Sequence, residues 1–203
     1  MRQIEITVKL EENLEDALLK LEKKGFKVIR ESDVDDIYVT TNDNIRFLKS
    51  LNKDEKKSKI IEILSESVLL RKLKLENNVI QKITYKDKKY DDDGNVISED
   101  KINVNIDDIL KTKEILKKLN VDELVEVKYH NLVYSNGIIE LDFQSVENLG
   151  ILIEYENENN FEGKTSEEIK NEKIKMAKQI NELGIIIGKD FDIKKAYELI
   201  INN

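Results

Sequence analysis

The sequence predicts an α+β fold in which about eight strands, each with one apolar and one polar face, are combined with several amphipathic helices. Strict alternation of apolar and polar residues supports the strands, as in QIEITVKL at residues 3–10. Apolar residues at helical spacing support the helices, as in DDILKTKEILKKL at residues 107–119. Both kinds of segment need an apolar surface to pack on, so a single domain spanning residues 1–203 is expected.

The composition is that of a globular chain with a high proportion of charge. Of the 203 residues, 39% are hydrophobic and 37% are charged, a balance that allows one buried core. No run approaches the roughly 18 apolar residues of a membrane span, and no signal peptide opens the chain. Cytoplasmic residence without a membrane partner is therefore expected, and association into a homodimer stays open.

Charge and cysteine content restrict the ligands. The net charge of -8 argues against nucleic acid as a partner, because a duplex binder needs a basic surface. A small polyanion is still allowed, since a basic lining can coexist with an acidic exterior. The chain has no cysteine. Any metal therefore has to be bound by oxygen ligands, which favours Mg²⁺ or Mn²⁺ over zinc.

The stretch at residues 137–156, GIIELDFQSVENLGILIEYE, is predicted to be two neighbouring strands joined by a short acidic loop. Asp142 lies on the polar face of the first strand. Glu154 and Glu156 project from one face of the second strand, roughly 7 Å apart. Three aligned carboxylates suit a divalent metal ion, although a hairpin face in contact with water has the same pattern.

The remaining elements follow in order along the chain. Further strands are expected at residues 26–41, with an acidic turn inside, and at 68–77, 79–86, 101–106 and 124–134. Helices are expected at residues 11–24, 44–66, 107–119, 165–183 and 193–200. Residues 87–100 are predicted to be a polar loop. Alternation leaves open whether the polar faces surround an apolar barrel or line a tunnel whose outer wall is covered by helices.

The order Asp142, Val146-Glu147, Leu149-Gly150 and Glu154-x-Glu156 resembles the C-terminal signature of the CYTH superfamily. These triphosphate tunnel enzymes include class IV adenylate cyclases, thiamine triphosphatases and inorganic triphosphatases. The resemblance extends in order over most of the chain. It implies a closed antiparallel β-barrel of about eight strands with helices packed outside, whose polar inner wall binds a triphosphate and a divalent metal. It therefore favours the tunnel over the apolar barrel.

The resemblance also implies which residues hold the metal. The first strand of the family carries Glu-x-Glu-x-Lys, and this chain has Gln3, Glu5 and Thr7 at those positions. The implied ligands of Mg²⁺ or Mn²⁺ are therefore Glu5 from this strand with Asp142, Glu154 and Glu156 from the hairpin. Lys9 lies one pleat further along the polar face and is the candidate catalytic lysine in place of the one lost at Thr7.

Lysines are the implied contacts to the triphosphate. Lys72 and Lys74 stand where the family has Leu-Arg-x-Arg, although Arg71 leaves the register ambiguous by one residue. Lys86 ends a Thr-Tyr-Lys strand that resembles a phosphate-binding strand of the family. Lysine supplies charge to a phosphate but lacks the bidentate fork of arginine, so it positions the phosphate less firmly.

The strand at residues 124–134 resembles the Lys-x-Arg strand of the family. Lys128 matches the lysine and is a candidate for both binding and catalysis, and His130 stands at the arginine. The alternative for His130 is a polar side chain on the wall or surface with no catalytic role. On the strand at residues 101–106, Asn103 and Asn105 stand where the family usually has acidic residues.

Two classes of function follow from these residues. The first is a metal-dependent enzyme that hydrolyses inorganic or small organic triphosphates, with a class IV-type adenylate cyclase as the alternative chemistry. The second is a catalytically impaired descendant that keeps the fold as a polyanion-binding or structural module. The substitutions at Gln3 and Thr7 weaken the first class, because each lost contact of this kind costs orders of magnitude in rate.

Overall fold

The computed structural model describes residues 4–90, 96–157, 159, 161 and 163–202, which form eight strands and six helices. The strands are β1 (Ile4–Lys9), β2 (Lys27–Thr41), β3 (Glu66–Leu75), β4 (Asn78–Tyr90), β5 (Val96–Asn105), β6 (Val121–Ser135), β7 (Glu140–Val146) and β8 (Gly150–Asn157). The helices are α1 (Leu14–Lys23), α2 (Asn42–Ser50), α3 (Lys53–Ser65), α4 (Ile109–Lys118), α5 (Ser166–Glu182) and α6 (Lys195–Asn202). None of these helices is long and apolar enough to cross a bilayer.

The strands pair in the order β1-β8-β7-β6-β2-β3-β4-β5. The pairings β1 with β8, β7 with β8, β2 with β3 and β3 with β4 are antiparallel. The predicted α+β class with eight strands is thus confirmed. The chain divides into two compact units. Unit 1 comprises Met1–Ser32, Tyr90–Ser98 and His130–Lys194, and unit 2 comprises Asp33–Lys89, Glu99–Tyr129 and Lys195–Asn203.

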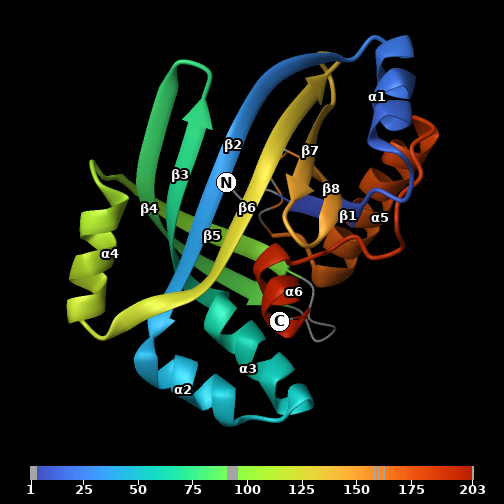
Figure 1. Ribbon diagram of the computed structural model, residues 1–203. Coiled ribbons are helices and arrows are strands. Elements are labelled where there is room, and N and C mark those ends of the chain that lie inside the picture. Colours follow the sequence, from blue (N-terminus) through green and yellow to red (C-terminus); the bar gives the residue numbers. More distant parts are fainter. Residues whose placement is uncertain (1–3, 91–95, 158, 160, 162, 203) are drawn as a thin grey trace. The chain divides into compact units, whose positions relative to one another are not determined.

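The core of unit 1 lies between the apolar faces of its strands and the helices α1 and α5 (Figure 1). Asn13 caps α1 by accepting a hydrogen bond from the backbone N–H of Glu15. Thr165 and Glu168 form a capping box at the start of α5. The apolar residues of the strands pack on these two helices; the buried set includes Ile6, Val8, Leu21, Leu141, Phe143, Ile153, Met176 and Ile180. Helices therefore cover the apolar face of unit 1, and the polar face is left to other contacts.

In unit 1, the segment that follows α5 runs along β1. The backbone N–H of Thr7 donates to the carbonyl of Phe191, and the N–H of Ile193 donates back to the carbonyl of Thr7. An antiparallel bridge joins Leu10 to Ile187 at the other end of β1. β1 stands first in the strand order, so this segment supplies hydrogen bonds to backbone groups that would otherwise form an open edge.

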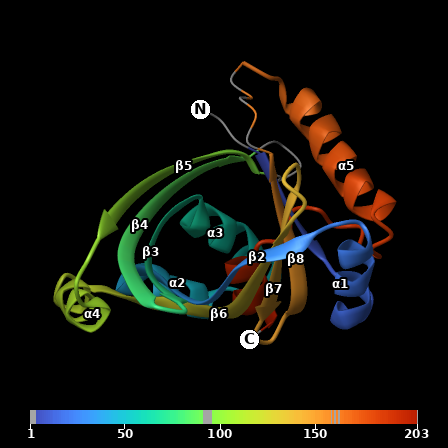
Figure 2. The same cartoon turned by 90° about the horizontal axis from the view of Figure 1, so that it is seen from above.

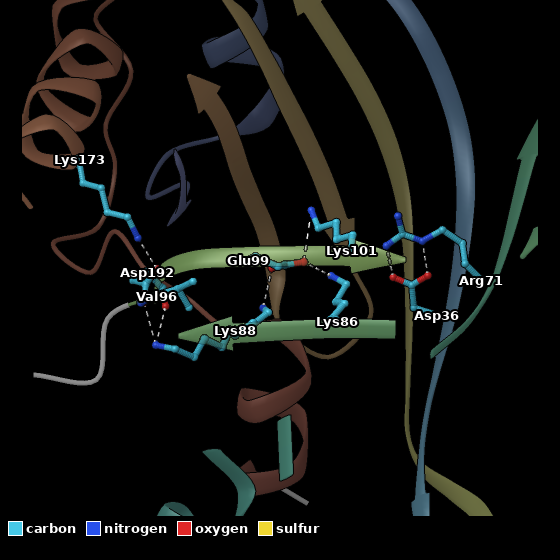
Figure 3. A network of polar contacts seen from close by, with 10 residues as sticks. Asp36, Arg71, Lys86, Lys88, Val96, Glu99, Lys101, Lys173 and Asp192 are labelled. Carbon is cyan, nitrogen blue, oxygen red and sulfur yellow. Dashed lines mark hydrogen bonds and ion pairs between the residues drawn. The ribbon is translucent and has the colours of Figure 1, made fainter. Parts of the chain in front are cut away.

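The carboxylate of Asp192 fixes this segment within unit 1 (Figure 3). It accepts hydrogen bonds from Lys173 Nζ at 2.9 Å and from the backbone N–H of Val96 at 3.1 Å. Lys194 Nζ lies 3.0 Å from the same carboxylate. Lys173 is only 2% exposed, so its ammonium depends on Asp192 for compensation of its charge. One ion pair therefore connects α5, the edge of β1 and the start of β5.

The core of unit 2 is built on β2, β3 and the helices α3 and α4. Val39 and Leu70 from the strands pack against Ile109 of α4. α4 begins after Asp108, which caps the helix: its side chain accepts a hydrogen bond from the backbone N–H of Lys111. α3 packs on β3 and buries three aliphatic residues, and β3 and β4 curve around it (Figure 2).

Three expected boundaries differ from the structure. Residues 26–41 contain no turn, and β2 runs through the acidic stretch without a break. The helical stretch at 44–66 is two helices, because Asn52 starts a second capping box with Glu55. The predicted loop at 87–100 is wrong: β4 extends to Tyr90 and β5 begins at Val96. Residues 91–95 lie outside the described part of the chain.

We expect Asp192→Ala to lower the free energy of unfolding by about 3 kcal/mol, because the buried Lys173 ammonium loses its counter-charge. Lys173→Met removes the same ion pair but leaves no buried charge, so a smaller loss of about 1 kcal/mol is expected. Urea denaturation of both variants measures the difference. Equal losses in the two variants would show that the ion pair is not what stabilises this segment.

Candidate functional site

Five cations of unit 2 lie on one face of β3, β4 and β5. We call this set the basic wall; it consists of Arg71, Lys82, Lys86, Lys88 and Lys101. Arg71 and Lys82 are direct partners in the pairing of β3 with β4, and residues directly opposite each other in a sheet share a face. Lys86 and Lys88 follow Lys82 at the two-residue spacing of one strand face. The predicted shared face of Lys82, Thr84 and Lys86 is thus confirmed.

Arg71 is held by Asp36 of β2. Its Nε and Nη2 donate to the two carboxylate oxygens of Asp36, both at 2.5 Å, in a bidentate pair. Burial disfavours the charge of Arg71, but the hydrogen bonds and charge of Asp36 outweigh this effect and raise the pKa of Arg71. Asp36 is itself only 3% exposed. The guanidinium is therefore fixed in place and permanently charged.

A single carboxylate, Glu99 of β5, lies among three lysines of the basic wall (Figure 3). Lys86 Nζ is 3.1 Å from its carboxylate, and the Nζ atoms of Lys88 and Lys101 are both 3.3 Å away. The Glu99 side chain is 10% exposed. Burial would raise the pKa of Glu99, but the three lysine charges prevail and lower its pKa to about 2.

Positive charge on this face exceeds negative charge. Among the named groups, five cations stand with only two carboxylates, those of Asp36 and Glu99. The excess acts on Lys82, whose pKa is lowered by burial and then by the charge of Arg71. A wall with this imbalance is chemically suited to attract a multiply charged anion.

The structure resolves the ambiguous register on β3. Lys72 and Lys74 share a face, as predicted, but it is the face of Val68 and Leu70, which pack in the cluster under α4. Arg71 lies on the opposite face, among the other cations. Lys72 and Lys74 are therefore not part of the basic wall, and their contact with a phosphate stays a prediction.

Lys128 lies on the other side of the sheet from Arg71. Asp35 and Asp36 are neighbours in β2, so their side chains point to opposite faces. Asp36 binds Arg71, whereas Asp35 is adjacent to Glu126, which forms an ion pair with Lys128 at 2.7 Å. The structure thus does not bring Lys128 together with the basic wall.

His130 belongs to unit 1 and is 3.5 Å from Glu31 through its Nε2 atom. By strand alternation it shares a face with Leu132 and Tyr134, which pack against the apolar cluster of α1 and α5. The imidazole is 40% exposed. This placement agrees with the alternative interpretation of His130 as a polar surface residue, and its proposed contact with phosphate stays a prediction.

The carboxylates of unit 1 form a second polar surface, which we call the acidic wall; it consists of Glu5, Asp142, Glu154 and Glu156. Glu5 is the direct strand partner of Glu156, and Asp142 is the direct partner of Glu154. Three of these residues, Asp142, Glu154 and Glu156, line one cavity of about 620 Å³. The structure thus brings together the hairpin carboxylates that the sequence singled out.

The donor types of the acidic wall fit Mg²⁺ or Mn²⁺, because both metals prefer carboxylate oxygens. Like charges directly opposite each other on paired strands repel, so a cation between them would relieve the repulsion. In the part of the chain that the structure describes, however, no three His, Asp or Glu side chains are close enough to hold one metal ion. Gln3, the substituted position of the first-strand motif, lies outside the described residues.

The other residues of β1 lie as the alternation predicted. Glu5, Thr7 and Lys9 share a face, opposite the buried Ile6 and Val8. Lys9 is exposed and its backbone carbonyl accepts a hydrogen bond from Gly188. Its catalytic role stays a prediction.

Sequence reasoning missed Lys88 and Glu99 because residues 87–100 are interpreted as a loop, and it placed Lys101 on a strand without assigning it to the site. The signal was present: Lys86 and Lys88 continue the alternation of β4, and Glu99, Lys101 and Asn103 continue that of β5. β5 thus carries one carboxylate, that of Glu99, on the face of Lys101 and Asn103. Asn103 instead accepts a hydrogen bond from Thr84 at 2.8 Å.

Comparisons with known proteins agree on the fold. The sequence is 28% identical over 199 residues, 97% of each chain, to "Putative adenylate cyclase MJ0240" of Methanocaldococcus jannaschii. The solved PH1819 protein of Pyrococcus horikoshii has a TM-score of 0.67 at 22% identity, with 98% of this chain and 99% of that chain covered. No family model matches the sequence.

A third similar chain is the adenylyl cyclase-like HpAC1 of Hippeastrum, described as having a dominant triphosphatase activity. The TM-score is 0.57 at 13% identity, with 100% of this chain and 96% of that chain covered. The chain is thus similar in sequence to a protein named as an adenylate cyclase, and it shares the fold of a protein described with triphosphatase activity.

The carboxyl groups of Asp35 in β2 and Glu126 in β6 lie next to each other, on the face opposite Arg71, and they make the stability of the fold depend on pH. Burial, followed by the charge of Glu126, raises the pKa of Asp35 to about 6 from an ordinary 3.8. Because the pKa of Asp35 is higher in the folded state than in the unfolded state, its protonated form favours folding. This contribution to stability is complete below about pH 4 and is lost as the pH rises through 6. We expect Asp35→Asn to stabilise the fold by about 1 kcal/mol at pH 7.5, a value reduced for solvent screening, and hardly at all at pH 4.

Thermal unfolding of this variant at the two pH values measures the effect. Asp33→Asn is the matched control, because Asp33 is exposed and two residues away on the same strand. The control should change little at either pH. A gain for Asp35→Asn that is the same at pH 4 and pH 7.5 would contradict the prediction.

Proposed function

We propose that this protein binds an inorganic or small organic triphosphate and hydrolyses it in the presence of Mg²⁺ or Mn²⁺, acting in the cytoplasm. The observation that carries the proposal is the basic wall, where Arg71 and four lysines gather on one face of unit 2. The similarity to the triphosphatase HpAC1 concerns the fold and supports the proposal at that level.

The basic wall contributes charge and orientation. Arg71 is rigid because Asp36 holds its guanidinium on two hydrogen bonds, so it serves as a fixed reference for one phosphate group. The lysines are longer and more flexible, and they adapt to the remaining phosphate oxygens. Neutralising the oxygens lowers the repulsion that an attacking nucleophile meets at phosphorus.

The acidic wall is the proposed position of the metal. Glu5, Glu154 and Glu156 would hold Mg²⁺ or Mn²⁺, with Asp142 as a further carboxylate. When bound, such a metal supplies Lewis-acid charge to the phosphate oxygens. The opposed pairs Glu5 with Glu156 and Asp142 with Glu154 support this assignment, because a cation between them removes a repulsion built into the strand register.

We further propose that the sheet closes into a tunnel. Support comes from unit 1 alone, where Asp192 lies in the segment paired with β1 and also accepts a hydrogen bond from Val96 at the start of β5. β1 and β5 are the first and last strands of the order. A connection between them through Asp192 is what closure of the barrel requires.

The choice of nucleophile separates two reactions. Water gives a triphosphatase, and the ribose 3′-hydroxyl of ATP gives an adenylate cyclase. The name of the Methanocaldococcus jannaschii relative favours keeping the cyclase as the second candidate. Hydrolysis is preferred here, because the sequence contains no residues that resemble a dedicated nucleoside pocket.

Purified protein with tripolyphosphate and Mg²⁺ or Mn²⁺ should release phosphate. Arg71→Ala should lower the rate at least about 100-fold, because it removes the one rigid phosphate contact. Phosphate release is measured by a colorimetric assay, and cyclic AMP formation from ATP is followed in parallel.

Glu154→Gln serves as the background control, since it removes a proposed metal ligand without changing side-chain size. If the wild type turns over tripolyphosphate no faster than Glu154→Gln but binds it tightly, the protein is a polyanion-binding module and not an enzyme. Absence of both turnover and binding would leave only the fold.

Metal binding can be measured separately from activity. We expect saturating Mg²⁺ or Mn²⁺ to raise the melting temperature by about 5 °C, because a ligand bound only by the folded state stabilises that state. Glu156→Gln should abolish this increase. In EDTA the same variant should be slightly more stable than the wild type, since it removes one of two opposed charges.

Glu147→Gln is the matched control for this measurement, because Glu147 is an exposed carboxylate in the turn of the same hairpin. It should keep the full response to metal. An identical metal response in Glu156→Gln and Glu147→Gln would rule out the acidic wall as the metal site.

A further inference from the structure

The position of Glu99 is unusual for a residue of a phosphate-binding surface. It brings a negative charge to the place where positive charge is most concentrated, within 3.1 to 3.3 Å of three ammonium groups. Figure 3 shows the carboxylate between Lys86 and Lys88 on one strand and Lys101 on its own strand. The cluster is partly shielded from water, because the side chains of Lys86 and Lys88 are 13% and 17% exposed whereas that of Lys101 is 42% exposed.

A carboxylate and a phosphate group make the same kind of contact with an ammonium group. Both present oxygen atoms that accept short, charge-assisted hydrogen bonds from Nζ. The contacts of Glu99 are ion pairs at 3.1 to 3.3 Å, so a phosphate that approaches these lysines competes with the carboxylate for the same positive charges. The low pKa of Glu99, about 2, shows that its negative charge is kept at every physiological pH.

Without an anion the lysine cluster would be unfavourable. Three ammonium groups would lie close together in a partly buried space with Arg71 and Lys82 nearby, and the pKa of Lys82 is already lowered by burial and by Arg71. Some negative group has to occupy the cluster in the free protein. Glu99 meets this need from within the chain.

We propose that Glu99 is a built-in anion that occupies Lys86, Lys88 and Lys101 in the free protein and is displaced by a phosphate group of the incoming polyanion. This inference rests on the proposed function, because it assumes that the basic wall binds phosphates. It adds a specific role: Glu99 competes with the ligand, keeps the wall folded when no ligand is bound, and promotes release of the shorter phosphates formed by hydrolysis.

The competition predicts opposite changes in stability and in affinity. Glu99→Gln removes the carboxylate that the three lysines share, so the free protein should melt at a lower temperature. The same variant should bind tripolyphosphate about 10-fold more tightly in about 50 mM salt, because the ligand no longer displaces a carboxylate and relieves the lysine repulsion. The dependence of affinity on salt should also become steeper, since the ligand neutralises one more cation.

The experiment is isothermal titration calorimetry of the full chain with tripolyphosphate, in metal-free buffer at several salt concentrations. Asp100→Asn is the matched control: it removes the same charge from the adjacent residue of β5, which is exposed and points to the other face. Its affinity should stay within about twofold of the wild type. Glu99→Asp tests the idea with the charge retained, and its shorter side chain should give an intermediate gain in affinity.

The outcomes separate this inference from the proposed function. Tighter binding by Glu99→Gln, with Asp100→Asn unchanged, supports the built-in anion. If the wild type binds tripolyphosphate and both Glu99→Gln and Glu99→Asp bind it equally well or more weakly, the built-in anion is overturned. Glu99 then positions the lysines, and the proposed function is unaffected. No binding of tripolyphosphate by the wild type or by either Glu99 variant overturns both.

Discussion

Most strands of this chain bury one apolar face, and the helices that cover these faces decide where the charged side chains lie. In unit 1, α1 and α5 cover the face that carries Ile6, Val8 and Ile153. In unit 2, α4 covers the face that carries Val39 and Leu70. Because alternate residues point to opposite sides, this burial fixes the acidic wall and the basic wall on the faces that these helices leave.

The charge distribution follows from the same constraint. The chain as a whole is acidic, with a net charge of -8, yet one face of unit 2 gathers five cations. Asp36 and Glu99 offset part of this charge, each in a different way. Asp36 fixes a single arginine through two hydrogen bonds, whereas Glu99 is shared among three lysines. The first arrangement gives a rigid contact, and the second gives one that an anionic ligand can take over.

The buried ion pair of Lys173 and Asp192 adds a third kind of charge contact. Its partners come from α5 and from the segment beside β1, and the Asp192 carboxylate also binds the backbone of β5 at Val96. A buried pair of this kind costs desolvation energy. Its main contribution is therefore to specify which segments of the chain pack together. Here it ties the first and last strands of the order to the same residue.

The sequence by itself determined the strands, most of the helices and the identity of the acidic residues. Alternation is a local property, so it separated Glu154 and Glu156 from Ile151, Ile153 and Tyr155 without any knowledge of the fold. It also placed Lys82, Thr84 and Lys86 on one face of β4.

Only the tertiary structure decided which alternating face gathers the cations and where the strands end. Arg71 and Lys72 are adjacent, and nothing local shows which of them faces the other cations; the packing of Val68 and Leu70 on α4 settles it. Lys88 and Glu99 lie in strands because β4 and β5 are neighbours in the sheet and their backbones hydrogen-bond to each other. The sequence of this stretch alternates, but it is polar, and only its pairing in the sheet distinguishes a strand from a loop.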